Sequence, residues 1–183
     1  IMKPIEFQNE KEARYEVAVK TMLDIKKLQT GYKSVHGKYA DTFEELIKFV
    51  ENGQFEIVSR RDTAVIDAAK NAAFGITVGA DGVGGFFKDE VVITKLGSVS
   101  VKDSLFKNSD RYKRLNVVKV GEVEVPVIMK TGVVNRSDMN LSVFQAIIDK
   151  NALLKDLDQE LVKQENKVES IDEINGPQII LGS

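Results

Sequence analysis

Few side chains in this sequence are suited to chemistry. Its 183 residues include one histidine, His36, and no cysteine. A single histidine cannot build a histidine-based metal site, and the lack of cysteine excludes disulfides, thiolate zinc sites and cysteine nucleophiles. His36 lies beside Gly37, where a turn is expected, so we interpret it either as a packed turn residue or as a pH-sensing base. No catalytic centre is marked, and we expect no enzymatic activity.

Charged residues occur in clusters that do not resemble a reactive site. Glu44-Glu45 and the acidic residues from 156 to 160 fall on predicted solvent-facing helix surfaces, whereas Arg60-Arg61 and residues 107–114 are basic. The formal net charge is −2, and nucleic-acid binding requires a broader basic face than these segments supply. We therefore expect no nucleic-acid partner.

The element that organises the chain is an amphipathic run from Glu10 to Tyr39. Its apolar residues recur three and four positions apart, which places them on one face of an α-helix. Asn9 is the predicted N-cap, and Gly37 is the predicted stop. A helix of roughly 40 Å cannot bury such a face alone, so later segments must cover it. We expect residues 22–35 to lie in the core and the more polar part before Ala18 to project.

The rest of the chain predicts a second helix followed by strands. Thr42 to Glu45 fits a capping box and opens a short helix that ends at Asn52-Gly53. An alanine-rich helix is predicted at 63–74, and the helical period returns after Asn151, with a strand through Leu161-Val162 as the alternative. Strands are predicted at 55–59, 76–78, 90–94, 97–101, 115–120, 122–129 and 143–148.

This order of elements favours an α+β fold, in which the two helices pack on an antiparallel sheet of about four to six strands. We expect one domain of residues 1–183, with residues 1–36 as a stem helix and residues 37–183 as a globular head. The first residues, Ile1-Met2-Lys3-Pro4, are interpreted either as the point where an upstream segment was removed or as an arbitrary domain boundary.

The end of the first helix resembles that of type II secretion pseudopilins and type IV pilins. Residues 25–39 read Ile-Lys-Lys-Leu-Gln-Thr-Gly-Tyr-Lys-Ser-Val-His-Gly-Lys-Tyr. Ala40 stands where pilins carry proline. The resemblance implies a pilin-like domain, with a long helix on an antiparallel sheet outside the cytoplasmic membrane. The positions that match are Tyr32, Gly37, Lys38, Tyr39, Thr42 and Leu46.

The whole chain is also similar to the envelope-facing part of uncharacterised single-pass membrane proteins of Bacteroidota. Their segment after the membrane span likewise reads Lys-Pro-Ile, and the stretch from Ser100 to Phe106 is typical of them. This resemblance implies a domain in the periplasm that is anchored in the inner membrane by an N-terminal helix. The implied partners are protein subunits of an envelope assembly, including copies of the chain itself.

A glycine-rich segment, Gly79 to Gly85, resembles the loop through which major pseudopilins bind calcium. Calcium requires six to eight oxygen ligands, and the nearby carboxylates are Asp81, Asp89 and Glu90. The segment is therefore interpreted either as a calcium site or as a glycine-rich turn, and no other cofactor is predicted.

The apolar stripe of the first helix and the turn after it form the predicted structural and interaction surface. The stripe packs either on the domain's own sheet or on neighbouring subunits, as in a filament core. The preferred hypothesis is a non-catalytic pilin-like subunit of an envelope assembly or secretion apparatus. The alternative is a membrane-anchored periplasmic adaptor or binding module that does not polymerise. The surface consists of Met22, Ile25, Leu28, Tyr32, Val35, Gly37 and Tyr39.

Overall fold

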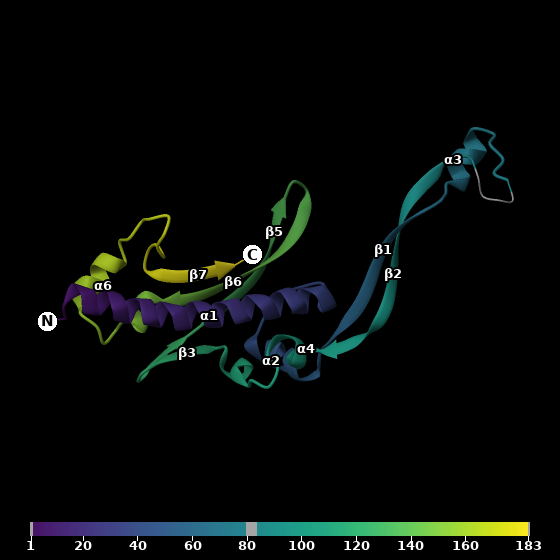
Figure 1. Cartoon of the computed structure of the whole chain (residues 1–183). Coiled ribbons are helices and arrows are strands. Elements are labelled where there is room, and N and C mark those ends of the chain that lie inside the picture. Colours follow the sequence, from purple (N-terminus) through teal and green to yellow (C-terminus); the bar gives the residue numbers. More distant parts are fainter. Residues whose placement is uncertain (1, 80–83, 183) are drawn as a thin grey trace. The chain divides into compact units, whose positions relative to one another are not determined.

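The computed structural model describes residues 2–79 and 84–182 (Figure 1). Contacts group the chain into two compact units, Ile1–Gly53 with Ser100–Ser183 and Gln54–Val99, where the sequence analysis expected one domain. The elements are α1 (Pro4–His36), α2 (Phe43–Asn52), β1 (Gln54–Ile66), α3 (Ala68–Ala73), β2 (Phe87–Ser100), α4 (Val101–Leu105), the 3-10 helix η1 (Arg111–Arg114), β3 (Val117–Val120), β4 (Val123–Pro126), β5 (Ile128–Arg136), β6 (Met139–Asp149), α5 (Lys150–Leu153), α6 (Gln159–Glu165) and β7 (Gln178–Gly182).

Helix α1 begins six residues before the predicted start, so Asn9 lies inside the helix and does not cap it. Lys3 is the N-cap, and Pro4 occupies the first turn, where its missing N–H costs no hydrogen bond. At the other end Gly37 has φ +77° and donates its N–H to the Lys33 carbonyl at 2.8 Å, which confirms the predicted stop. Among the described residues, no helix combines the length and apolar character needed to cross a membrane.

The buried face of α1 extends further toward the N-terminus than predicted. Met22, Ile25 and Leu28 lie in the core, as expected, but Val35 is 49% exposed. The part before Ala18 was predicted to project, and this prediction is wrong: α1 is covered there by residues from the C-terminal part of the chain. The side chains buried in that part are Phe7, Lys11, Arg14 and Tyr15.

Helix α2 opens with the predicted capping box. The Thr42 side chain accepts from the Glu45 N–H, and the Glu45 carboxylate accepts from the Thr42 N–H. The helix ends at Asn52, as predicted. Gly53 was expected to adopt a left-handed backbone, but its φ is −77°. A Cβ at Gly53 would lie 2.4 Å from the Phe49 carbonyl oxygen, so close packing is what requires glycine.

The first unit contains two antiparallel sheets. One pairs β3 with β4, and the other has the order β5-β6-β7. Helix α1 lies along β3, β6 and β7 (Figure 1). The described strands of this unit form two sheets where the sequence predicted one. The strand predicted at 122–129 is divided after Pro126, which has no N–H to donate, and the Val127 N–H donates to the Asn116 carbonyl at 2.9 Å.

The helical period predicted after residue 151 is found in part: α5 and α6 are two short helices separated by residues 154–158, and Leu161-Val162 is helical rather than a strand. Asp149, not Asn151, caps α5, because the Asp149 carboxylate accepts from the Asn151 N–H at 2.8 Å. Strand β7 returns the chain to β6, where Ile180 pairs with Ile147.

The second unit is a two-stranded ribbon, β1–β2, with α3 between its strands. The helix predicted at 63–74 starts only at Ala68, because residues 63–66 belong to β1. Residues 76–78 form no strand, and β2 continues through Leu96-Gly97, where a break was expected. Asn71 is buried and pairs with the Phe86 backbone through both amide atoms.

Candidate functional site

The predicted interaction stripe is largely used inside the first unit. Met22, Ile25 and Leu28 are buried, so they are unavailable to a partner in this conformation. Tyr32 is half-buried and packs on the Phe49 ring, with ring centroids 5.3 Å apart. Tyr39 packs on Phe144 of the sheet at 4.9 Å. The stripe and its turn therefore attach α1 to α2 and to the domain's own sheet.

The three predicted calcium ligands are not brought together in the part of the chain that the structure describes. Asp81 lies outside the described residues. Asp89 and Glu90 are consecutive in β2, so their side chains point to opposite faces of the ribbon. Within residues 2–79 and 84–182 no three His, Cys, Asp or Glu residues are placed to hold a metal ion. The calcium site stays a prediction.

An unpredicted polar cluster joins α1 to the C-terminal part of the chain. The carboxylate of Glu165 on α6 accepts hydrogen bonds from the Lys11 ammonium at 3.1 Å, the Tyr15 hydroxyl at 3.0 Å and the Lys150 ammonium at 3.3 Å. Lys150 also donates to the Ile174 carbonyl, and its side chain is 0% exposed. Glu165 is the shared acceptor and pairs with lysines from two distant elements. We define these four side chains as the Glu165 cluster.

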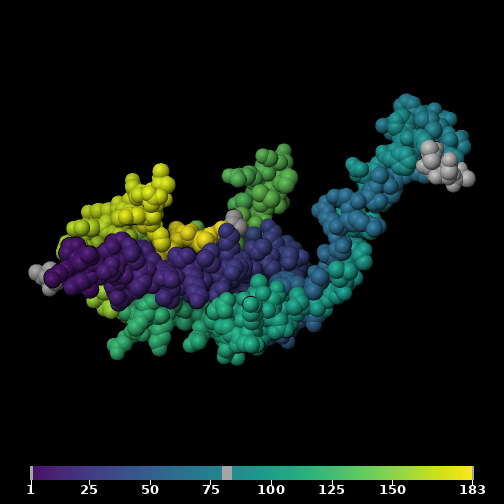
Figure 2. Space-filling model, viewed as in Figure 1, coloured from purple at the N-terminus to yellow at the C-terminus, as the bar shows by residue number. Residues whose placement is uncertain are grey.

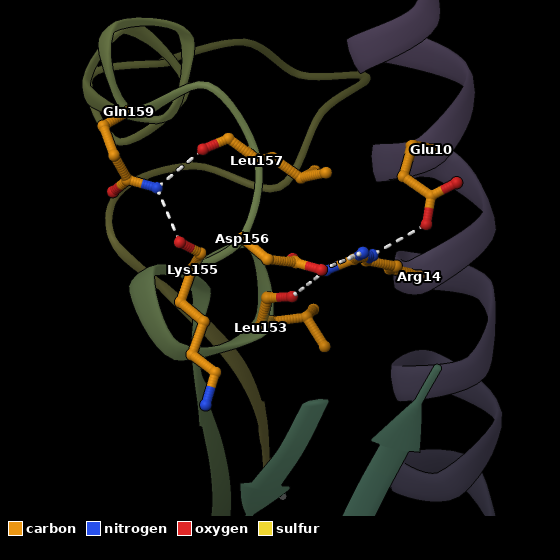
Figure 3. Close-up of polar contacts among 7 residues, drawn as sticks. All are labelled: Glu10, Arg14, Leu153, Lys155, Asp156, Leu157 and Gln159. Carbon is orange, nitrogen blue, oxygen red and sulfur yellow. Dashed lines mark hydrogen bonds and ion pairs between the residues drawn. The ribbon is translucent and has the colours of Figure 1, made fainter. Parts of the chain in front are cut away.

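A second polar connection lies beside it (Figure 3). The buried Arg14 guanidinium donates to both carboxylate oxygens of Asp156, at 2.5 and 3.1 Å, and to the Leu153 carbonyl at 2.8 Å. Its Nε donates to Glu10 one turn back on α1, at 2.9 Å. The hydrogen bonds from Arg14 hold the pKa of Asp156 below its usual value. Arg14 thus ties α1 to the turn that follows α5.

Burial of the Glu165 cluster predicts a pH-dependent stability. Burial lowers the pKa of Lys150 and raises the pKa of Tyr15 above its usual 10. Between the lowered pKa of Lys150 and its usual 10.5, the unfolded chain binds more protons at Lys150 than the folded chain, so Lys150 makes the free energy of unfolding rise with pH in that interval. Above pH 10 the folded chain keeps the Tyr15 proton, and the free energy of unfolding falls.

This dependence can be measured by urea unfolding between about pH 8 and 11. Lys150→Met should remove the rise in the free energy of unfolding that precedes pH 10. Tyr15→Phe should reduce the fall in the free energy of unfolding above pH 10. If the free energy of unfolding of the Lys150→Met variant differs from that of the natural sequence by the same amount at every pH, the prediction is wrong.

Exposed apolar side chains mark both strands of the β1–β2 ribbon. Ile93 and Leu96 of β2 are each 66% exposed. Residues alternate between the faces of a strand, so Ile93 faces one side of the ribbon and Leu96 the other. Apolar side chains therefore lie on both faces, where an ordinary surface ribbon would carry polar ones. The other large apolar side chains exposed on the ribbon are Ile57, Val58, Ile66, Phe87, Val91 and Val92.

Within the first unit, the β5–β6 hairpin projects from the neighbouring elements (Figure 2). Its turn residues Ser137 and Asp138 have φ +52° and +63°, the left-handed pair that matches the twist of a two-residue hairpin. Val133 and Met139 near this turn are exposed. Two β-ribbons thus present apolar residues to solvent.

Sequence reasoning missed the Glu165 cluster, although one signal for it was available. Lys11 and Arg14 lie at helical spacing from Ala18 and Met22, so both continue the apolar face toward the N-terminus. Charged residues in register with a buried face indicate buried ion pairs.

Comparison with known proteins gives no match to a family model, a curated protein or a solved structure.

Proposed function

We propose that the chain is the periplasm-facing part of a non-catalytic, pilin-like or pseudopilin-like subunit of an envelope assembly or secretion apparatus. Its anchor would be an inner-membrane helix that precedes α1, as the resemblance of residues 25–46 implies. Its partners would be other protein subunits, including copies of itself. The packing of a long helix on an antiparallel sheet supports this class of protein.

The observation that carries the proposal is the apolar surface of the β1–β2 ribbon. A two-stranded ribbon is marginally stable alone, and exposed Ile and Leu side chains are favourable only when something covers them. Fully covering one such side chain contributes about 1.5–3 kcal/mol. The ribbon is therefore proposed to pack on another subunit.

The first test is self-association, measured by sedimentation velocity. The natural sequence should associate at micromolar concentration. Ile93→Asp should weaken association by about tenfold or more, because it places a carboxylate where the proposed interface would cover an apolar side chain. Thr94→Asp adds the same charge to the opposite face of the same strand, the face that carries Leu96, so comparing the two variants shows which face is covered. A natural sequence that stays monomeric at about 100 μM contradicts self-assembly.

A second candidate, the non-polymerising adaptor, is favoured by the start of α1. Lys3 has an extended backbone, with φ −70° and ψ 144°, so α1 is not continuous with a helix through residue 3. A membrane helix that continued without a break into α1 would favour the pilin-like subunit instead.

A photo-crosslinking residue at position 93, introduced into the protein in its native membrane, separates the two candidates. Adducts between copies support a subunit, and adducts with a different envelope protein support an adaptor. Equal yields at positions 93 and 94 would contradict a specific interface on this face.

A further inference from the structure

We propose that a groove between α1 and the η1–β3–β4 segment binds a small amphiphilic anion, such as an alkyl phosphate or an alkyl carboxylate. The groove has a volume of about 500 Å³ and lies within the first unit. Pockets of this size hold small organic molecules. The inference does not depend on the proposed assembly.

Positive charge is concentrated along this groove. Lys20, Arg111, Arg114 and Lys119 line it, against the two acidic residues Asp24 and Glu124. Asp24 is engaged by Arg111, and Glu124 lies 4.0 Å from Lys119. Lys20 and Arg114 have no ion-pair partner in the described part of the chain. Two positive charges therefore remain uncompensated at the groove, although the protein as a whole has a net charge of −2.

Arg111 is held in place before any ligand arrives. Its Nε and Nη2 donate to the two carboxylate oxygens of the buried Asp24, at 2.8 and 3.3 Å. Its guanidinium stacks on the buried Phe106 ring, 4.7 Å from the centroid. The side chain has thus already lost its rotamer freedom, and its Nη1 donors form no hydrogen bond with described residues. A fixed guanidinium with free donors suits a carboxylate or phosphate oxygen.

Apolar side chains complete the groove. Val17 of α1, Leu115 and Val117 line the groove together with the charged residues. Val17 is 42% exposed, so an apolar group placed there would cover surface that now contacts water. An anionic head at Arg111, Arg114 and Lys20 with an alkyl chain over these residues satisfies both parts of the lining.

The test uses decyl phosphate below its micelle concentration, with binding measured by isothermal titration calorimetry on the whole chain. Saturable binding is expected at up to about 1 mM and should weaken as salt is raised. Lys20→Gln and Arg114→Gln should each weaken binding by about tenfold, since each removes a charged contact. Both side chains are exposed and unpaired, so the variants should fold, which circular dichroism verifies.

The matched controls are Lys27→Gln on α1 and Lys113→Gln on η1, which lie outside the groove lining and should bind as the natural sequence does. Absence of saturable binding, or equal loss in the controls, overturns the proposal. Inorganic phosphate binding as tightly as decyl phosphate also overturns it, because the apolar lining would then contribute nothing. If the protein co-sediments with phosphatidylglycerol vesicles and Arg114→Gln abolishes this, the source of the anion is a lipid headgroup. If the protein binds decyl phosphate but not the vesicles, the ligand is a free amphiphile.

Discussion

Glu165→Ala is expected to lower the free energy of unfolding by about 3–5 kcal/mol, the typical effect of removing one partner from a buried ion pair. The change removes the carboxylate that pairs with both buried lysines, Lys11 and Lys150, and it removes the acceptor of the Tyr15 hydroxyl. A loss of this size is a large fraction of the stability of most domains. Urea unfolding followed by circular dichroism measures it.

Two variants make this prediction specific to the buried charge. Glu160→Ala removes an exposed carboxylate on the same helix, paired with Lys163 at 2.8 Å, and should change the free energy of unfolding little. Glu165→Gln keeps the volume and part of the hydrogen bonding, so its cost should lie between those of the two alanine variants. Equal costs for Glu160→Ala and Glu165→Ala would show that the Glu165 cluster contributes nothing to stability.

Gln29→Leu should destabilise the protein by about 2–5 kcal/mol, because it leaves two buried backbone groups without partners. The Gln29 amide donates to the Ala40 carbonyl at 2.9 Å and accepts from the Ala40 N–H at 2.8 Å. Both residues are fully buried, so water cannot replace these bonds. The change keeps the side-chain size, so the loss reports the hydrogen bonds more than packing.

The matched control is Gln8→Leu, an exposed position on the same helix, whose amide donates to the exposed Glu12 side chain. It should change the midpoint of urea unfolding little. If both substitutions shift the midpoint equally, Gln29 does not hold the turn at Ala40 against α1, and another contact must fix the path of the chain from α1 to α2.

Local signals predicted several elements correctly. The apolar spacing of Met22, Ile25 and Leu28 identified α1, and Gly37 identified its end, because both depend on residues within one or two turns. The Thr42–Glu45 capping box identified the start of α2 for the same reason. Such signals are written in adjacent residues and need no knowledge of the rest of the chain.

Predictions failed where distant segments decide the outcome. The part of α1 before Ala18 seemed too polar to be buried, yet Lys11 reaches Glu165, a residue 154 positions away. The helix predicted from residue 63 is a strand as far as Ile66, because these residues pair with β2 and three of the four, Thr63, Val65 and Ile66, are β-branched. In both cases the local sequence pattern does not show the distant segment that the residues contact.

The sequence by itself determined the α+β class, the long first helix and the short helix after it, because helix periodicity and caps act over a few residues. Only the tertiary structure decided that buried lysines and an arginine attach α1 to the C-terminal part of the chain, and that basic residues gather at one groove. Burying a charge is favourable only when a partner is in place, and folding alone brings residues of opposite charge together from the two ends of the chain.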